Sequence, residues 1–322
     1  MHLKELLERH GQASSISVPD WLVGCFQRRS ITFANGLTDS QTLVFWLQSR
    51  NITIDLRLPI ESEQVAAKQL EDYGEKELRS LANYEGWYAE SLWQDDWLSW
   101  TGGASFQIHN RWPEPASLVR VGDCMMEFSP DASYIEEWRT LSREPGPLVG
   151  LRLIVEEDLK TGCVRHRDGA LIINGGFAGL VLGRAKDLNA NISDHQQSKR
   201  QLRDLVSTEQ HREAFLQDVF NFETSVAVGD MVSGFSITHS TRAARLKRTL
   251  FPLDGFEFDD ASQEIIHVFI EGDTTIKRRF SIDTCEDNFP FSGSTPLADS
   301  ATGWLNFEHE TLGRYLKMWE RE

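Results

Sequence analysis

The sequence predicts a mainly β protein that consists of two tandem antiparallel β-barrels, each with a helical insertion. Three observations predict this fold. Short segments that alternate apolar and polar residues recur along the chain, as in strands with one buried face. Each half places one longer stretch of helical spacing between such segments. A run rich in proline and glycine separates the two halves.

Barrels are favoured over open sheets because closure of an antiparallel sheet removes its unpaired strand edges. A pair of β-sandwiches is the alternative. The chain of 322 residues exceeds the usual size of one hydrophobic core, so two domains are expected.

The first barrel is expected over residues 28–145, after an N-terminal segment, residues 1–27. That segment opens on a helix whose leucines share one face, and Gly11 ends it. The clearest strand is 51–58, in which apolar and polar residues alternate until Pro59. The other strands of this half are predicted at 30–34, 42–48, 86–93, 104–112, 117–121, 124–128 and 134–139.

Residues 61–83 show helical spacing, with Gly74 as a weak point in the middle. The prolines and glycine of residues 143–147 disfavour a helix, and the prolines cannot donate the hydrogen bonds of a β-ladder. We therefore place the domain boundary there and expect the second barrel over residues 146–322. Its helix is expected over 196–220. Its strands are expected at 148–155, 163–167, 170–173, 177–184, 224–228, 234–239, 264–270 and 275–282.

Charge and cysteine usage limit the partners and the compartment. The formal net charge is −16, which repels phosphate backbones and anionic lipid headgroups, so neither nucleic acid nor a membrane surface is expected as a partner. The four cysteines are scattered without zinc-site spacing, and no apolar run suits a signal peptide or a membrane span. We therefore expect a cytoplasmic protein with reduced thiols, and we leave open whether it forms a homo-oligomer.

No P-loop, dinucleotide fingerprint or His-Glu-x-x-His motif is present. The glycines of residues 174–179 lie between two strands and predict a hairpin rather than a phosphate loop. We therefore expect no cofactor and no metal.

Two predicted strands carry a polar row opposite an apolar row. On an open sheet these polar rows would face water, whereas a closed barrel covered from outside would confine them in its lumen. In the strands 51–58 and 104–112 the rows include Asp55, Arg57, His109 and Arg111.

Confinement would give these groups chemical roles. His109 is the candidate general acid or base, because histidine titrates near neutrality, and Glu127 or Glu136 would be a second titratable group. Arg57 and Arg111 would bind a carboxylate or enolate of the substrate. Asp55 would stay ionised beside arginine and contribute to the same binding site.

Seven of the ten tryptophans lie within residues 28–145. Indole rings suit the walls of a pocket for a planar or cationic ligand, and packing of the barrel core is the alternative. Trp46, Trp87 and Trp112 are the candidate wall residues.

In the second half, His239 and His267 lie on the apolar faces of predicted strands. This position is more typical of histidines that are hydrogen-bonded within the core than of ligand-binding histidines. Two basic clusters, residues 165–167 and 242–248, indicate solvated charge. Anion capture and pairing between the domains are the alternatives.

The segment Trp46-Leu47-Gln48-Ser49, which leads to Ile54-Asp55-Leu56-Arg57 within this plan of strands, resembles the calycin group of lipocalin-like barrels. More loosely, the chain is similar to fungal proteins made of two calycin-like barrels in tandem. The lipocalin Gly-x-Trp signature is absent, so the resemblance does not extend to ordinary lipocalin transport. It implies a barrel with a ligand-sized interior, in a carrier or in a cofactor-free lyase, isomerase, hydratase or cyclase.

Three functions follow from this pattern. The first is a cofactor-independent enzyme of specialised biosynthesis that acts on a small organic molecule by acid and base chemistry. The second is a non-catalytic small-molecule binding or carrier protein with the same pocket. The third is a protein-interaction module whose barrels are filled by side chains.

Overall fold

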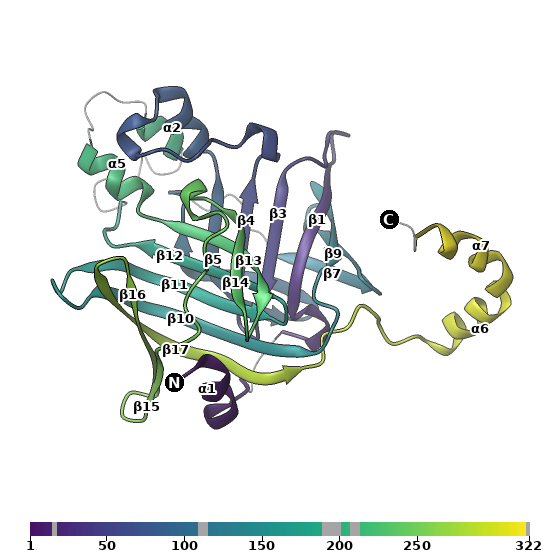
Figure 1. Ribbon diagram of the computed structural model, residues 1–322. Coiled ribbons are helices and arrows are strands. Elements are labelled where there is room, and N and C mark those ends of the chain that lie inside the picture. The colour runs from purple at the N-terminus through teal and green to yellow at the C-terminus, as the bar shows by residue number, and fades with distance from the viewer. Residues whose placement is uncertain (15–17, 109–114, 189–200, 207–212, 320–322) are drawn as a thin grey trace.

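The computed structural model describes residues 1–14, 18–108, 115–188, 201–206 and 213–319. Its fold is mainly β, with two antiparallel sheets whose strands cross at a steep angle (Figure 1). Helix α1 (Leu3–His10) lies against the second sheet, and the helices α6 (Asp299–Phe307) and α7 (His309–Trp319) extend from the body of the molecule. None of the helices in the described part of the chain combines the length and hydropathy needed to cross a bilayer.

The first sheet closes into an eight-stranded barrel, as the sequence predicts for this half. Its strands follow the order β1-β3-β4-β5-β6-β7-β8-β9, and β1 pairs with β9 from Phe26 opposite Thr140 to Phe33 opposite Tyr134. β2 (Thr38–Asp39) extends the sheet beside β1. The strands are β1 (Gly24–Phe33), β3 (Leu43–Gln48), β4 (Ile52–Leu58), β5 (Glu85–Gln94), β6 (Trp97–Ser105), β7 (Ala116–Val121), β8 (Cys124–Phe128) and β9 (Tyr134–Thr140).

The second sheet covers part of the outside of this barrel. The apolar row of β4, including Ile54 and Leu56, shares one core with Ile172 and Val226 of the second sheet. Because successive side chains of a strand point to opposite faces, the polar row of β4 is directed into the lumen.

The second sheet has the order β14-β13-β12-β11-β10-β17-β16-β15, and its ladder is open between β14 and β15. Residues 246–255 lie across this gap. Leu250 N–H donates to the Phe235 carbonyl of β14, and Val268 N–H of β16 donates to the Gly255 carbonyl. The strands are β10 (Gly146–Asp158), β11 (Val164–Asn174), β12 (Phe177–Arg184), β13 (Glu223–Asp230), β14 (Gly234–Ser240), β15 (Phe256–Asp259), β16 (Glu264–Glu271) and β17 (Thr274–Phe289).

The helices and one strand depart most from the sequence prediction. The strand expected over 104–112 is wrong in its described part, because β6 ends at Ser105 and residues 106–108 form no strand. Residues 61–83 form two 3₁₀ turns and only one α-helix, α2 (Glu75–Leu81), which begins directly after Gly74. Tyrosine hydroxyls accept hydrogen bonds from the Val65 and Lys68 backbone N–H groups, so tertiary contacts replace the helical ladder there. Within 196–220 the described helices are α4 (Leu202–Leu205) and α5 (Glu213–Phe220). The C-terminal helices were not predicted.

The two sheets approach most closely at Gly86 of β5. A Cβ atom at this position would lie 2.4 Å from Thr224 Oγ1 of β13, which is fully buried. We expect Gly86→Ala to lower the free energy of unfolding by about 1–3 kcal/mol, because the added methyl group overpacks the contact between the sheets. Urea unfolding measures this loss. Gly303→Ala in α6 has nothing within 4 Å and is the control, and an equal effect of both changes would contradict the close packing.

Candidate functional site

One end of the barrel lumen is filled by apolar side chains. Phe26, Trp46, Leu98 and Met125 belong to one buried cluster, which also includes Trp138. Trp46 packs edge-on against Trp138, with 5.3 Å between the ring centroids. This end of the lumen is therefore a packed core. Trp46 and Trp138 contribute to that core, which the sequence left as the alternative to a pocket wall.

A neutral polar cluster lies among these rings. Gln48 Oε1 accepts hydrogen bonds from Trp46 Nε1 at 3.1 Å and from Thr53 Oγ1 at 2.6 Å. Thr53 Oγ1 in turn accepts one from Trp100 Nε1 at 3.0 Å, and Gln48 Nε2 donates to Ser91 Oγ at 2.9 Å. Each partner is a neutral group, so this cluster orients the indoles without adding charge.

A charged layer spans the lumen near its open end. Arg57 Nε donates to Asp55 Oδ1 at 2.9 Å, and Arg57 Nη1 lies 3.9 Å from Glu136 Oε1. Arg28 Nη1 binds the same Glu136 oxygen at 2.7 Å, while its Nη2 binds Asp39 Oδ2 at 2.8 Å. The charged groups of the lumen are therefore joined into one network from β1, β4 and β9.

Carboxyl groups outnumber guanidinium groups in this layer. Four carboxyl side chains are at most 9 % exposed, and two arginines face them. The four are Asp55, Glu85, Glu127 and Glu136. Since ionised groups are costly to bury without a counter-charge, the excess favours a carboxyl group that keeps its proton.

Glu127 is a carboxyl group whose surroundings favour the protonated form. It lies directly opposite Glu136 in the pairing of β8 with β9, and its Oε2 accepts a hydrogen bond from Trp138 Nε1 at 2.9 Å. Burial, and then the charge of Glu136, raise the pKa of Glu127 well above its ordinary value. Burial also raises the pKa of Asp55, and Arg57 opposes that shift only in part.

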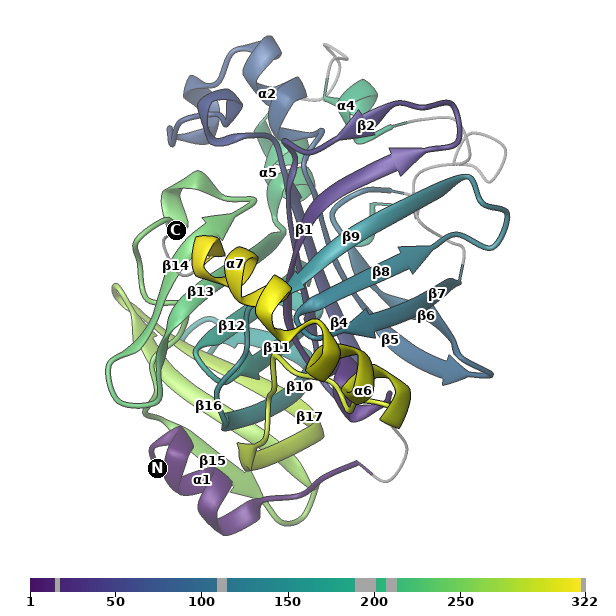
Figure 2. The same ribbon diagram turned by 90° about the vertical axis from the view of Figure 1, so that its right-hand side faces the viewer.

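Two cavities meet at Arg57. The larger one, about 420 Å³, is a vestibule at the end of the barrel where Arg28, Glu85 and Asn83 contribute to its walls. The smaller chamber, about 20 Å³, lies deeper among Trp87, Glu127 and their neighbours. The helix α2 lies at this end of the barrel (Figure 2). The vestibule has ligand size, and the chamber has room for about one water molecule.

The structure brings together six of the nine residues predicted for the site. The inner chamber is lined by five of them, Asp55, Arg57, Trp46, Trp87 and Glu127. The sixth, Glu136, is not among the lining residues, but its Oε1 lies 3.9 Å from Arg57 Nη1. The Nε1 atom of Trp87 is buried and has no hydrogen-bond partner among the described residues. His109, Arg111 and Trp112 lie outside the described residues, so their placement stays a prediction.

Two charged residues of the layer were missed in the sequence. Arg28 lies next to a bulge between Arg28 and Ser30, which interrupts the alternation of β1. Glu85 is the first residue of β5, where an alternating pattern is too short to read. No local signal distinguishes either residue from a solvated charge.

Arg57 has a more restricted role than the sequence suggested. Its guanidinium group already faces two carboxylates, so binding of an anionic substrate would compete with Asp55 and Glu136. The charge of the layer instead favours a neutral or cationic group in the vestibule, because carboxyl groups are in excess.

The histidines of the second half are held by their surroundings. His267 is 1 % exposed, stacks on Phe256 at 3.9 Å between centroids, and is hydrogen-bonded to the Asp254 carbonyl. His239 packs against Phe45 with 4.4 Å between centroids. Both contacts are those of packed histidines.

No family model, no characterised protein and no solved structure matches this chain.

Replacing the Glu127 carboxyl group by an amide is expected to alter the pH dependence of stability. Because its folded pKa is raised, Glu127 stabilises the fold fully below about pH 4.5, and this contribution is lost as the pH rises through the folded pKa. Each pH unit between the unfolded and the folded pKa costs about 1.4 kcal/mol. We expect Glu127→Gln to lose less stability between pH 4.5 and 8 than the wild type, measured by urea unfolding.

The matched control is Glu137→Gln, since Glu137 is the next residue of β9 after Glu136 and pairs with Arg139 on the outside of the barrel. A pH dependence that is the same for Glu127→Gln, Glu137→Gln and wild type would show that Glu127 is ionised in the folded protein.

Proposed function

We propose that this protein is a cofactor-independent enzyme of the lyase, isomerase, hydratase or cyclase type. Its substrate is a small organic molecule that binds in the vestibule at the end of the first barrel. The observation that carries the proposal is the excess of buried carboxyl groups directly beneath a ligand-sized cavity. A buried like-charged pair is destabilising for the fold, and strongly shifted carboxyl groups in a cleft are typical of acid and base sites.

In this proposal Glu127 donates a proton to one atom of the substrate as general acid, and its carboxylate then accepts a proton from another atom, which restores the carboxyl group. Burial and the charge of the neighbouring Glu136 raise the pKa of Glu127, which favours its protonated form. The inner chamber has room for about one water molecule, which would relay the proton between Glu127 and a substrate in the vestibule, because Arg57 lines both cavities. His109 stays a second candidate for the acid or base.

The fold supports the proposal as well. We infer that the first barrel is calycin-like and that residues 246–255 complete a second barrel of the same kind. The supporting contacts are the hydrogen bonds of this segment with β14 and β16. In such a tandem arrangement the second barrel covers part of the outer wall of the first barrel. The apolar row of β4 packs against this cover, and its polar row faces the lumen.

A non-catalytic carrier is the second candidate, and one observation favours it. The chamber that contains Glu127 is too small for a substrate, and Arg57 separates it from the vestibule. A molecule held in the vestibule alone would be bound without being converted.

Ligand-observed NMR in D₂O separates the two candidates. A library of small organic molecules is incubated with the protein, and both line broadening and loss of C–H signals are followed. The enzyme is expected to exchange a C–H proton of at least one bound compound for deuterium, and Glu127→Gln is expected to bind it without exchange. Binding without exchange by the wild type would support the carrier.

A variant that fills the vestibule tests whether the small molecule binds there. Ser80→Trp places an indole in the vestibule wall, whereas Lys76→Trp lies on the exposed side of the same helix α2 and is the control. Loss of binding is expected for Ser80→Trp only. Unchanged binding by Ser80→Trp would exclude the vestibule as the binding site.

A further inference from the structure

A second cavity lies where the segment before α2 meets the second sheet. Its volume is about 530 Å³, and it is lined from the turn at residues 68–73, from β11, from α5 and from residues 241–244. It has no residue in common with the barrel vestibule. The two cavities are therefore separate, and each has a volume typical of a small-molecule site.

The charge of this cavity is opposite to that of the chain. Lys68, Arg165 and Arg242 line it, and no aspartate or glutamate is among its described lining residues. Lys68 Nζ is paired with Glu77 at 2.7 Å, so the two arginines are the candidates to bind an anion. The whole chain carries a formal net charge of −16. A positive hollow in a negative protein concentrates field lines for an anion.

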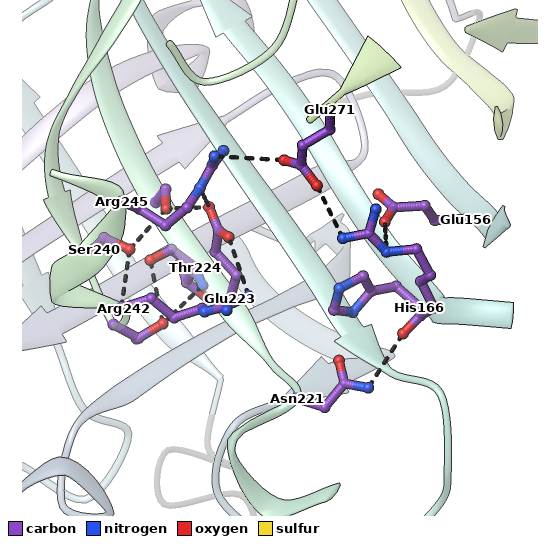
Figure 3. A network of polar contacts seen from close by, with 12 residues as sticks. Glu156, His166, Asn221, Glu223, Thr224, Ser240, Arg242, Arg245 and Glu271 are labelled. Atoms are coloured by element: carbon purple, nitrogen blue, oxygen red, sulfur yellow. Dashed lines mark hydrogen bonds and ion pairs between the residues drawn. The ribbon is translucent and has the colours of Figure 1, made fainter. Parts of the chain in front are cut away.

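Carboxylates hold the two arginines at the cavity wall; Figure 3 labels Arg242 together with Glu156, Glu223 and Glu271. Arg165 Nη2 binds Glu271 at 2.9 Å and its Nε lies 3.4 Å from Glu156, while Arg242 Nη1 lies 3.9 Å from Glu223. These carboxylates are also shared with Arg245 and Arg278. Among the described residues, four guanidinium groups thus face three carboxylates, so the network carries one positive charge in excess.

A further guanidinium group adds to the positive potential. Arg184 lies 5.3 Å from the centroids of both Phe106 and Phe222, which line the cavity. Its hydrogen bonds go to the backbone carbonyl groups of Ser105, Phe106 and Val219. Carbonyl groups satisfy its donors but carry no net charge, and burial lowers its pKa although Asp187 opposes the shift.

His166 provides a polar atom in the cavity wall. The residue is 4 % exposed, and its Nδ1 lies 2.9 Å from the Gly183 carbonyl. Because a carbonyl group only accepts, Nδ1 carries the proton of the neutral ring and Nε2 keeps its lone pair. Nε2 has no hydrogen-bond partner among the described residues, so it is available to a donor group of a ligand.

The rest of the lining is apolar and aromatic. Phe106, Phe220 and Phe222 form one group, in which the Phe106 ring centroid lies 6.1 Å from that of Phe220 and 5.7 Å from that of Phe222. Tyr73 and Leu70 contribute from the opposite side. A ligand that fits this lining has a planar apolar body in addition to its charge.

We propose that this cavity is a binding site for an aromatic organic carboxylate, whose carboxylate group binds Arg242, because Arg242 lies 3.9 Å from Glu223 and is held less closely by carboxylates than Arg165. The aromatic body of the ligand packs among the three phenylalanines. A hydroxyl or amide donor on that body binds His166 Nε2. The site is separate from the proposed reaction site in the barrel and does not depend on it.

Isothermal titration calorimetry with 3-(4-hydroxyphenyl)propionate tests this site, with the neutral amide of the same acid as the matched probe. We expect the wild type to bind the acid at least about tenfold more tightly than the amide, because only the acid forms charge-assisted hydrogen bonds. Arg242→Gln is expected to remove most of this difference. Arg248→Gln, on the same segment but outside the cavity lining, is expected to leave it unchanged.

Four results would overturn the site. Equal affinities for the acid and the amide would exclude recognition of the charge, and so would an unchanged affinity in Arg242→Gln. Competition by inorganic phosphate at the same concentration would exclude the aromatic body as a determinant. Loss of binding in Ser80→Trp would place the probe in the barrel vestibule instead.

Discussion

Arg57→Met is expected to lower the free energy of unfolding by about 3–5 kcal/mol at pH 7. Arg57 is the hydrogen-bonded partner of Asp55, which is 3 % exposed, and it lies 3.9 Å from Glu136. Methionine fills a similar volume but leaves the Asp55 carboxylate buried without its counter-charge. Chemical unfolding monitored by the fluorescence of the barrel tryptophans measures the loss.

A second substitution shows whether charge is the cause. Asp55→Asn in the Arg57→Met background removes the isolated carboxylate, so the double variant is expected to regain part of the lost stability. It also keeps the comparison measurable if the single variant does not fold. Arg29→Met, at an exposed position of β1, is the control and is expected to change stability by about 0.5 kcal/mol or less. An effect of Arg57→Met as small as that of the control would mean that Asp55 does not need its counter-charge.

His267→Phe is expected to make the fold much less sensitive to acid. Burial, together with the charge of Arg278, lowers the pKa of His267 to about 3. In the unfolded chain histidine takes up a proton near pH 6.5, so its contribution to stability is complete above pH 6.5 and is lost as the pH falls towards 3. The loss amounts to roughly 5 kcal/mol over this range.

Phenylalanine cannot take up this proton and fits the same stack between Phe256 and Phe269. At pH 7 we expect the variant to lose about 1 kcal/mol, because the hydrogen bond to the Asp254 carbonyl is removed. At pH 4 we expect it to be more stable than the wild type, as measured by unfolding at both pH values. His309→Gln, at an exposed position of α7, should follow the wild type at both pH values. Equal acid sensitivity of His267→Phe and wild type would show that His267 is protonated in the folded state.

Individual buried groups of the two halves contribute to stability with opposite pH dependences. In the barrel, Glu127 and Asp55 favour the fold at low pH, because burial raises their pKa values. In the second sheet, His267 favours it at higher pH, and so does Glu156, whose pKa the neighbouring guanidinium groups lower although burial opposes them. The difference in the free energy of unfolding between a variant and the wild type, measured at each pH, gives the contribution of the substituted group.

Much of the strand plan could be predicted because alternation is a local pattern. The bounds of β8 and β12 agree with the prediction residue for residue, and α1 buries the three leucines that share its predicted face. β11 was predicted as two strands, since Asp168 and Gly169 interrupt the pattern. In the structure both have a positive φ at a register shift, and the strand continues through them.

The helix predicted over 61–83 failed because its spacing is only one of several forces on that segment. Contacts with the end of the barrel, such as the hydrogen bond from Val65 N–H to the Tyr84 hydroxyl, hold it in another conformation. Intrinsic helix propensity is a weak preference that tertiary contacts readily override.

For the candidate site, the order of residues in β4 already determines that Asp55 and Arg57 share a face, because side chains of a strand alternate strictly. The amino-acid order does not determine whether that face meets water or other side chains. That depends on the pairing of β1 with β9, whose partners are more than one hundred residues apart, and on the second sheet that covers the apolar row of β4. Local periodicity contains no information on such distant contacts, so the enclosure of the carboxyl groups and the assembly of the second cavity come from the folded structure alone.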